Sequence, residues 1–188
     1  PGPDSGGLPA GRDCDPSRGM DDPMTSQTKI HKGYADGRWG QVHYSQCGEG
    51  RPLVLVHQSP TDSVQFARVL QPLARRGIRA IAIDLPGFGG SDTPDAPPAM
   101  PDYAHIVPAV LDQLRIPRAS VLGHHTGAVV VTEAALQFPA RVARVILNGP
   151  LPMSAGKPLL PALASPRSVQ FGKAVTTLSR TVFVWLKE

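Results

Sequence analysis

The sequence predicts an α/β fold in which a mostly parallel central sheet is flanked by helices. Short apolar runs rich in β-branched residues alternate along the chain with longer segments of helical periodicity. Runs of the first kind are typical of strands that are buried on both faces, as in parallel sheets. Polar or glycine-rich segments directly follow three of these runs. Since loops at the carboxyl ends of parallel strands meet at one edge of the sheet, we expect the functional groups there.

The expected strands differ in how deeply they should be buried. Residues 41–45 alternate polar and apolar side chains, which is typical of a strand with one exposed face. A continuous apolar run predicts a buried strand at residues 53–56, and further buried strands are expected at residues 79–84, 119–122 and 142–147. Their composition predicts the buried centre of the sheet.

Helices are expected between the strands, where apolar side chains recur at helical spacing. The expected helices cover residues 63–76, 103–114 and 126–138, and a further helix could form over residues 168–186. The first of these is followed by Gly77 and the third by Pro139, both of which commonly end helices. Residues 85–101 are rich in glycine and proline and are expected to form a loop.

Charge and composition limit the classes of partner. The 188-residue chain has a formal net charge of +4, and its arginines fall mostly at the expected helix ends and strand starts. No basic run is interleaved with aromatic residues, which argues against a nucleic-acid partner. No segment approaches the roughly 18 apolar residues of a membrane helix, and no signal-peptide pattern is present. The two cysteines, Cys14 and Cys47, form no disulfide framework, so we expect a cytoplasmic protein.

Three segments of different composition define the expected domain organisation. Residues 1–23 are dominated by Pro, Gly, Asp, Ser and Arg, so a disordered extension is expected, with Met24 as a candidate natural start. Residues 24–152 carry the alternating pattern of strands and helices and are expected to form the core. Residues 153–188 have weak periodicity at first and are interpreted as the start of a lid or as an aberrant tail.

Three motifs at expected strand ends carry the chemistry. The first is His57-Gln58-Ser59-Pro60, and the second is the glycine-rich segment from Asp84 to Asp92. The third is Gly123-His124-His125-Thr126-Gly127. An apolar run enters the third motif and a helical run leaves it, which is the pattern of a nucleophile elbow, Gly-x-Ser-x-Gly, with histidine in place of serine.

The order and spacing of these motifs resemble those of the α/β-hydrolase superfamily. The resemblance covers roughly residues 33–152 and is closest to the lid-bearing branch of epoxide hydrolases, haloalkane dehalogenases and small esterases. It implies that the backbone N–H groups of Ser59 and Thr126 form the oxyanion hole, and that residue 125 occupies the nucleophile position. It also implies a mainly structural role for the segment from Asp84 to Asp92.

Two residues depart from the family pattern. Gln58 replaces a glycine of the oxyanion loop, and His125 replaces the usual Ser, Asp or Cys. An imidazole at residue 125 could attack a carbonyl carbon, could activate water, or could only fill space in a degenerate elbow. His57, Gln58 and His124 are expected around the substrate pocket, with His57 fixing its loop and His124 packed or hydrogen-bonded. A two-histidine metal site is not expected, because adjacent residues of a tight turn point in different directions. No cofactor is expected.

The rest of a catalytic triad is not visible in the sequence. No histidine follows His125 and no aspartate follows Asp112, and the remaining acids, Glu133 and Glu188, do not follow expected strands. The resemblance implies further strands that carry an acid and a histidine, so we interpret the chain as C-terminally truncated. A sheet that ended after Leu147 would have an open apolar edge, which predicts poor solubility or partial unfolding.

Three functions therefore remain open at the level of the sequence. The first is hydrolysis of an ester or related substrate, with His125 attacking or activating water. The second is a non-hydrolytic reaction on the same scaffold, such as that of a lyase or a cofactor-free oxygenase. The third is a catalytically inactive binding protein with a hydrolase-like pocket, because fold alone does not choose among chemistries.

Overall fold

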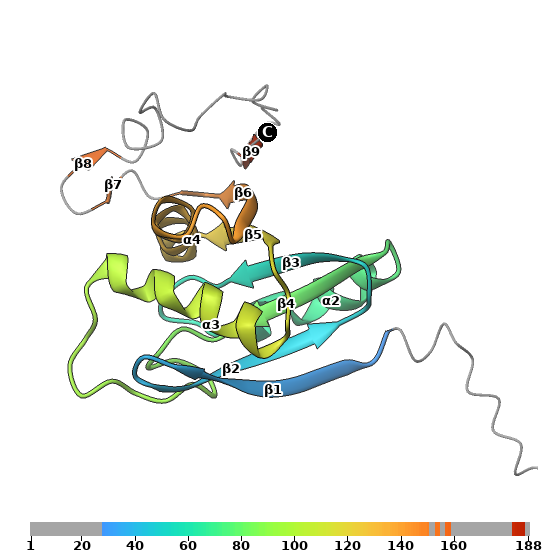
Figure 1. The fold of residues 1–188 in the computed structure, drawn as a ribbon, viewed down its shortest axis with the longest axis horizontal. Helices are drawn as coiled ribbons and strands as arrows, with labels where there is room; N and C mark the ends of the chain where they lie inside the picture. Colours follow the sequence, from blue (N-terminus) through green and yellow to red (C-terminus); the bar gives the residue numbers. More distant parts are fainter. Residues whose placement is uncertain (1–27, 151–152, 155–156, 159–181, 187–188) are drawn as a thin grey trace, which may run out of the picture.

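A seven-stranded sheet forms the centre of the molecule, with the strand order β1-β2-β4-β3-β5-β6-β9 (Figure 1). The computed structural model describes residues 28–150, 153–154, 157–158 and 182–186. The strands of the sheet are β1 (Ile30–Gly37), β2 (Gly40–Cys47), β3 (Arg51–Val56), β4 (Ile78–Ile83), β5 (Ala119–His124), β6 (Val142–Asn148) and β9 (Val182–Leu186). A separate short pair consists of β7 (Met153–Ser154) and β8 (Lys157–Pro158).

The sheet is mostly parallel, as the sequence predicts. The pairs β4–β3, β3–β5 and β5–β6 are parallel, whereas β1–β2, β2–β4 and β6–β9 are antiparallel. Since β1 is antiparallel to β2, which is itself antiparallel to β4, β1 runs in the direction of the parallel strands. Only β2 and β9 oppose that direction.

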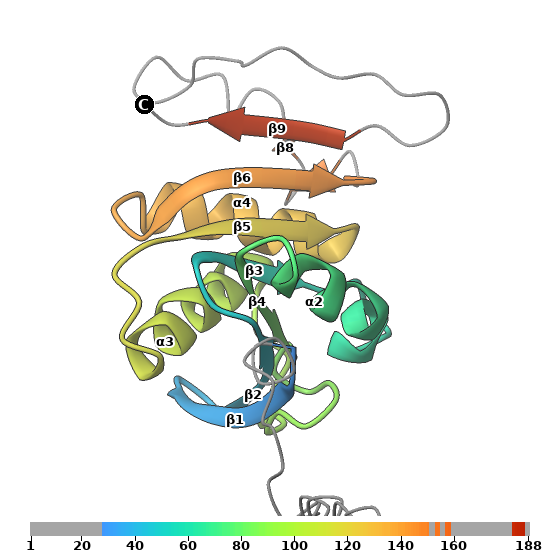
Figure 2. The ribbon, with the colours of Figure 1, turned by 90° about the vertical axis from the view of Figure 1, so that its right-hand side faces the viewer.

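Helices cover both faces of the sheet (Figure 2). The helical segments are η1 (Ser63–Phe66), α2 (Ala67–Ala74), η2 (Met100–His105), α3 (Ile106–Gln113) and α4 (Thr126–Gln137), of which η1 and η2 are 3₁₀ helices. Helix α2 packs on one face, and α3 and α4 pack on the other. The three expected helices are thus present, two of them with a 3₁₀ first turn.

Alternation of side chains along the buried strands produces two cores. Leu53 and Leu55 of β3 belong to the core under α2, whereas Val54 and Val56 belong to the core under α3 and α4. All four side chains are at most 9% exposed. This two-sided burial explains why β3 is a continuous apolar run in the sequence, because successive side chains of a strand point to opposite faces.

Two expectations about the ends of the sheet are wrong. Residues 182–186 form strand β9 and not part of a helix, while residues 168–181 of that expected helix lie outside the described residues. The sequence Val-Phe-Val-Trp-Leu of β9 is β-branched and aromatic, a composition that favours a strand. Because β9 pairs antiparallel with β6 from Arg144 to Asn148, the edge expected to be open after Leu147 is covered. Strand β9 is now the edge strand on this side of the sheet, and poor solubility stays a prediction.

Strand β1 was not expected from the sequence. It carries little apolar pattern, and most of its side chains are at least partly exposed. It forms because a two-residue turn at Arg38 and Trp39 folds it back onto β2 in register, from Ile30–Cys47 to Gly37–Gly40. This pairing depends on backbone hydrogen bonds, which hydrophobic patterning does not reveal.

The register brings the three motif loops to the same edge. Val56, the last residue of β3, pairs with Ile83 of β4 and with Gly123 of β5. His124, the last residue of β5, pairs with Asn148 of β6. The carboxyl ends of the parallel strands are thus level, as the sequence analysis expected. Within the described part of the chain, no helix is long and apolar enough to cross a membrane.

Candidate active site

The turn between β5 and α4 has the backbone geometry of a nucleophile elbow. His125 has φ 47° and ψ −111°, a conformation that residues other than glycine rarely adopt. The turn is possible because Gly123 and Gly127 have no side chain, so the backbone can pack closely against both residues. A Cβ atom at Gly123 would meet the carbonyl of Gly127, and one at Gly127 would meet the carbonyls of Val56 and His57. The strained residue is therefore held at the tip by close backbone packing on both sides.

The side chain of His125 lies between its neighbours on β5 and β6. Its ring is 4.5 Å from that of His124, centroid to centroid, in an edge-on arrangement. It also passes so close to Gly149 that a Cβ atom there would lie 3.2 Å from Nε2 of His125. Asn148, which sequence reasoning did not single out, binds both histidines through its backbone carbonyl oxygen. It accepts from the backbone N–H of His125 at 3.0 Å and from Nδ1 of His124 at 3.1 Å.

The two expected oxyanion-hole residues come together, but in an arrangement that the sequence did not indicate. The backbone N–H of Ser59 donates to Oγ1 of Thr126 at 2.8 Å. Thr126 is the first residue of α4, so its own N–H has no acceptor within the helix. The N–H of Ser59 is thus already paired with a side-chain oxygen of the elbow.

Gln58 turns its carbonyl into the loop. That oxygen accepts from the N–H and hydroxyl of Thr61, at 3.0 and 2.9 Å. Gln58 is partly exposed. Its backbone N–H donates to Oε1 of Gln65 at 3.4 Å. These bonds stabilise a tight loop between β3 and η1.

His57 is fully buried, and both of its ring nitrogens are used by the backbone. Nδ1 donates to the carbonyl of Gln58 at 2.8 Å, and Nε2 accepts from the N–H of Leu85 at 2.9 Å. The backbone partners fix one neutral tautomer, because an amide only donates and a carbonyl only accepts. Burial lowers the pKa of His57, although the Gln58 carbonyl partly opposes this. His57 therefore joins the first and second motif loops.

The buried neutral state of His57 predicts a pH-dependent stability. In the unfolded chain the pKa is about 6.5, whereas in the folded chain it is lowered. Below pH 6.5 the unfolded state binds a proton that the folded state does not, so stability falls as pH falls, by up to about 1.4 kcal/mol per pH unit. Above that pH the contribution is fully present.

Urea unfolding of the parent and of His57→Gln between pH 5 and 7.5 tests this slope. We expect the difference in unfolding free energy between the two proteins to shrink as the pH falls. A matched His31→Gln variant, which alters an exposed residue, should retain the slope of the parent. An unchanged slope in His57→Gln would contradict the assignment.

Asp84 ties four segments together directly behind this edge. Its side chain is 3% exposed. Its carboxylate accepts from the N–H of Ser63 at 2.6 Å, from Nδ1 of His43 at 2.7 Å and from the N–H of Gly90 at 2.9 Å. Burial by itself would raise the pKa of Asp84, but the bonds from Gly90, Ser63 and His43 outweigh it and lower the pKa. This geometry supports a structural role for the second motif.

His43 and Ser63 were not identified from the sequence. His43 is one of the partly exposed positions of an alternating strand, and Ser63 precedes a helical run. Neither position carries a local pattern that indicates Asp84, the residue directly after β4, as its partner. The position of Asp84 at the end of a buried strand was the available signal, because a buried carboxylate needs several donors.

The arrangement places an imidazole beside hydrogen-bond donors at the start of a helix. Such a site can stabilise a developing oxyanion while the imidazole either attacks a carbonyl carbon or activates water. In the part of the chain that the structure describes, His125 forms no ion pair with a carboxylate. The described residues also contain no cluster of three His, Cys, Asp or Glu residues suited to a metal ion.

Residues 51–170 match the protein family described as the alpha/beta hydrolase fold. The chain belongs to this family. Fold, elbow and family match agree with the resemblance drawn from the three motifs.

Individual relatives are similar over part of their length. The chain is 34% identical over 118 residues to the 2-hydroxy-6-oxononadienedioate/2-hydroxy-6-oxononatrienedioate hydrolase of Escherichia coli K12, covering 60% of this chain and 41% of that protein. The epoxide hydrolase CorEH aligns with a TM-score of 0.64 and 28% identity, over 69% of this chain and 46% of that one. An epoxide hydrolase from an endophytic Streptomyces aligns with a TM-score of 0.59 and 31% identity, over 62% and 36%. The chain thus spans about two fifths of the length of the curated relatives it matches.

Proposed function

We propose that residues 24–152 form the N-terminal part of a hydrolase core that acts on an ester or related small molecule, with His125 as its reacting group. The observation that carries the proposal is the elbow conformation of His125, with φ 47°. A strained backbone at a strand-to-helix turn persists only where the surroundings enforce it, and such strain is concentrated at functional sites. The close packing at Gly123 and Gly127 supplies that enforcement.

The proposed reaction has two routes that use the same residues. In the first, a ring nitrogen of neutral His125 attacks the substrate carbonyl, and the tetrahedral intermediate expels the alkoxide, which takes the proton of the other ring nitrogen. Water then hydrolyses the acyl-imidazole to the acid and free imidazole. In the second, His125 takes a proton from water as the water oxygen attacks the carbonyl carbon, and the imidazolium returns that proton to the alkoxide that leaves when the tetrahedral intermediate collapses. Both routes place negative charge on the carbonyl oxygen, which the N–H groups of Thr126 and Ser59 would stabilise. The Ser59 N–H becomes available when the substrate oxygen displaces the Thr126 hydroxyl.

Substitution of His125 tests the proposal. The purified chain is assayed with p-nitrophenyl acetate, styrene oxide and a vinylogous oxo-acid, three substrate types suggested by the site chemistry and by the names of the relatives. We expect His125→Ala to lower turnover by at least about 100-fold, the usual scale for removing an acid–base or nucleophilic group. His105→Ala, which removes a partly exposed imidazole at the end of η2, is the matched control for unspecific catalysis by imidazole and should retain the rate. Equal rates in the parent and His125→Ala would exclude His125 from the mechanism.

A label from water separates hydrolysis from the non-hydrolytic alternative. Reaction in ¹⁸O-water should place the label in the acid product if water is a reactant. Product formed without label would instead support a lyase or oxygenase reaction on this scaffold.

Binding without turnover is the second candidate function. It is favoured by the absence, in the described residues, of a carboxylate paired with His125. This candidate predicts that a substrate analogue raises the melting temperature of the chain while no product forms. In that case His125→Ala should reduce the thermal shift without affecting any rate.

A further inference from the structure

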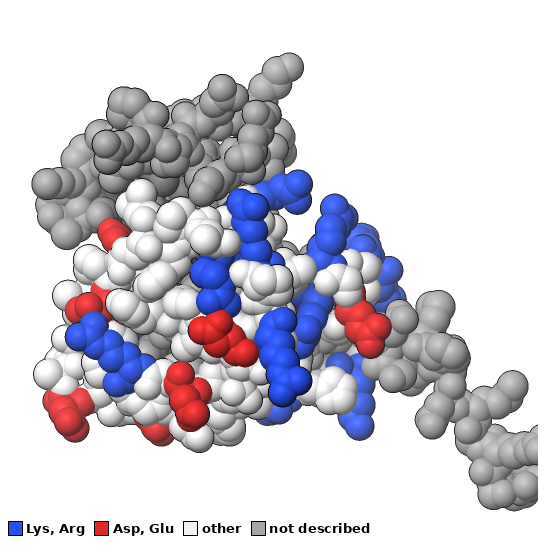
Figure 3. All heavy atoms as spheres, in the orientation of Figure 1, with Lys and Arg blue, Asp and Glu red and all other residues white. Residues whose placement is uncertain are grey.

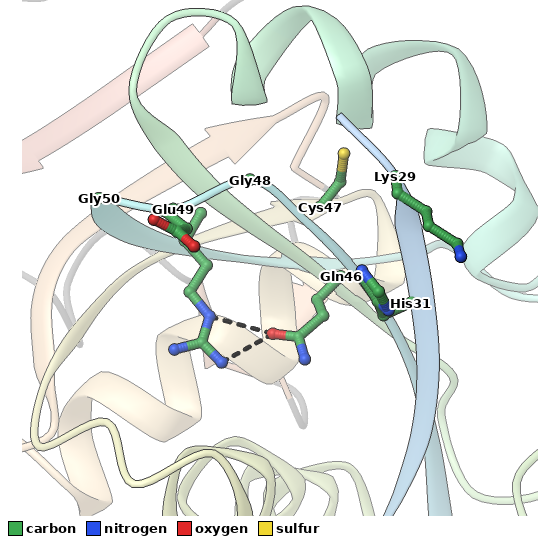
Figure 4. A pocket seen from close by; sticks show the side chains of 8 residues that line it. Lys29, His31, Gln46, Cys47, Gly48, Glu49 and Gly50 are labelled. Atoms are coloured by element: carbon green, nitrogen blue, oxygen red, sulfur yellow. Dashed lines mark hydrogen bonds between the residues drawn. The ribbon is translucent and has the colours of Figure 1, made fainter. Parts of the chain in front are cut away.

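A pocket lies at the opposite end of the sheet from the elbow, where the parallel strands begin. It has a volume of about 450 Å³ and is bounded by the turn from Gly48 to Gly50 and by side chains of β1, β2 and β4 (Figure 4). His31 of β1 is directly opposite Gln46 of β2 in the strand register. On β4 the direct partner of Gln46 is Ile81, and Arg79, two residues earlier, reaches Gln46 diagonally through its guanidinium.

Arg79 is the central group of this pocket. Both Nε and Nη2 of its guanidinium donate to Oε1 of Gln46, at 3.0 and 2.8 Å. Arg79 is only partly exposed, and it forms no ion pair within the described part of the chain. A guanidinium has five donors in a fixed fork, so the bonds to Gln46 hold the head in place and leave Nη1 for another acceptor. A partly buried arginine that is held by a neutral amide is well suited to bind an oxyanion.

The surroundings of the pocket are positively charged. Lys29 lines the pocket, and the exposed Arg51, Arg75 and Arg76 lie at the same end of the sheet. Figure 3 shows basic side chains gathered over this end of the molecule. Burial raises the pKa of the Cys47 thiol in the pocket wall, and the positive charge of Arg75 opposes part of that rise. A field of one sign over a concave site attracts ligands of the opposite sign.

Glu49 limits the kind of ligand that fits. It is the one carboxylate among the lining residues, and it lies on the turn between Gly48 and Gly50 (Figure 4). It would repel a second anionic group placed next to it. A ligand with a single anionic head is therefore favoured over a polyanion.

We propose that Arg79, Gln46, Lys29 and His31 form a binding site, separate from the candidate active site, for a small molecule that carries one phosphate or carboxylate head. The head binds Nη1 of Arg79 and the amide nitrogen of Gln46, and Lys29 supplies a further charge. The site lies at the amino ends of the strands, so its occupation does not compete for space with a substrate at His125. It does not depend on the hydrolase activity.

Nuclear magnetic resonance titration of the full chain tests this site. Inorganic phosphate and acetate are the probes, each added at constant ionic strength, and the signals followed are the side-chain Nε–H of Arg79 and the amides of Gly48, Glu49 and Gly50. We expect saturable shifts confined to this pocket with at least one probe. Saturation by phosphate alone or by acetate alone identifies the head group.

Matched variants separate a built site from diffuse attraction. Arg79→Gln should weaken binding by at least about tenfold, because it removes a charge-assisted bond. Arg144→Gln removes an equal charge from an exposed residue of β6 and should change the affinity less than about twofold. Equal weakening in both variants, or shifts that do not saturate with either probe, would overturn the proposal.

A second substitution keeps the test decisive if Arg79→Gln does not fold. Gln46→Glu is nearly isosteric and would pair with Arg79, which neutralises the site while the backbone remains in place. We expect it to abolish the saturable shifts without changing amide signals on α4. Retained binding in Gln46→Glu would contradict the role of Arg79.

Discussion

Replacing Asp84 with asparagine is expected to lower the free energy of unfolding by about 3–5 kcal/mol, the range for breaking a buried charged network. The carboxylate of Asp84 accepts hydrogen bonds from the N–H groups of Ser63 and Gly90 and from Nδ1 of His43. An asparagine side chain offers one acceptor oxygen and turns an NH₂ group toward the remaining donors. At least one buried donor then faces another donor and has no partner.

Urea denaturation at pH 7 measures this loss. Asp95→Asn, which removes an exposed carboxylate from the same loop, is the matched control and should stay within about 0.5 kcal/mol of the parent. The pH dependence gives a second readout. Because the pKa of Asp84 is lowered by folding, its contribution is complete above the unfolded value near 3.9 and is lost as the pH falls toward the folded value. An Asp84→Asn protein as stable as the parent would show that the network is not structural.

Replacing Gly127 with alanine is expected to destabilise the chain by about 3 kcal/mol or more, at the upper end of overpacking effects. A Cβ atom at this position would overlap the carbonyl oxygens of Val56 and His57, which are backbone atoms at the end of β3. Neither can rotate away, so α4 would have to move off the sheet. The elbow would be displaced with it, and any activity that depends on His125 should be lost together with stability.

Gly77→Ala provides the control that separates overlap from backbone strain. Gly77 has φ 70°, but a Cβ atom there would meet no atom within 4 Å. Its replacement should therefore cost only about 1–2 kcal/mol, the penalty of a left-handed conformation for an L-residue. Thermal and urea unfolding of both variants should show the larger loss in Gly127→Ala. Equal losses would mean that the contact with β3 is easily relieved.

The buried centre of the fold could be predicted from the sequence because burial leaves a pattern within each strand's own residues. Strands such as β3 and β4 are continuous apolar runs, and this pattern follows from burial on both faces. The edges of the sheet are not readable in this way. Strand β1 is held by backbone pairing with β2, and β9 pairs with β6 across a long separation in sequence. Hydrophobic periodicity contains no information about either partner.

In the candidate site, too, some features could be predicted from local sequence and others could not. The elbow and its neighbouring loops could be placed from glycine spacing, since the close approaches at Gly123 and Gly127 exclude other residues. The contacts between loops could not be placed. That the Thr126 hydroxyl would accept from the Ser59 N–H, or that His43 would reach Asp84, depends on side-chain orientation in three dimensions.

The length of the central strands separates the two ends of the sheet electrically. Strand β3 has six residues, so its first and last residues are about 17 Å apart at roughly 3.3 Å per step. That distance exceeds two Debye lengths at physiological ionic strength, which are about 8 Å each. Even at an effective dielectric constant of about 20, a unit charge at one end changes the energy of a charge at the other by less than about 1 kcal/mol. Charges around Arg79 can therefore be altered with little effect on the imidazole of His125, and any strong coupling between the two ends would have to pass through movement of the strands.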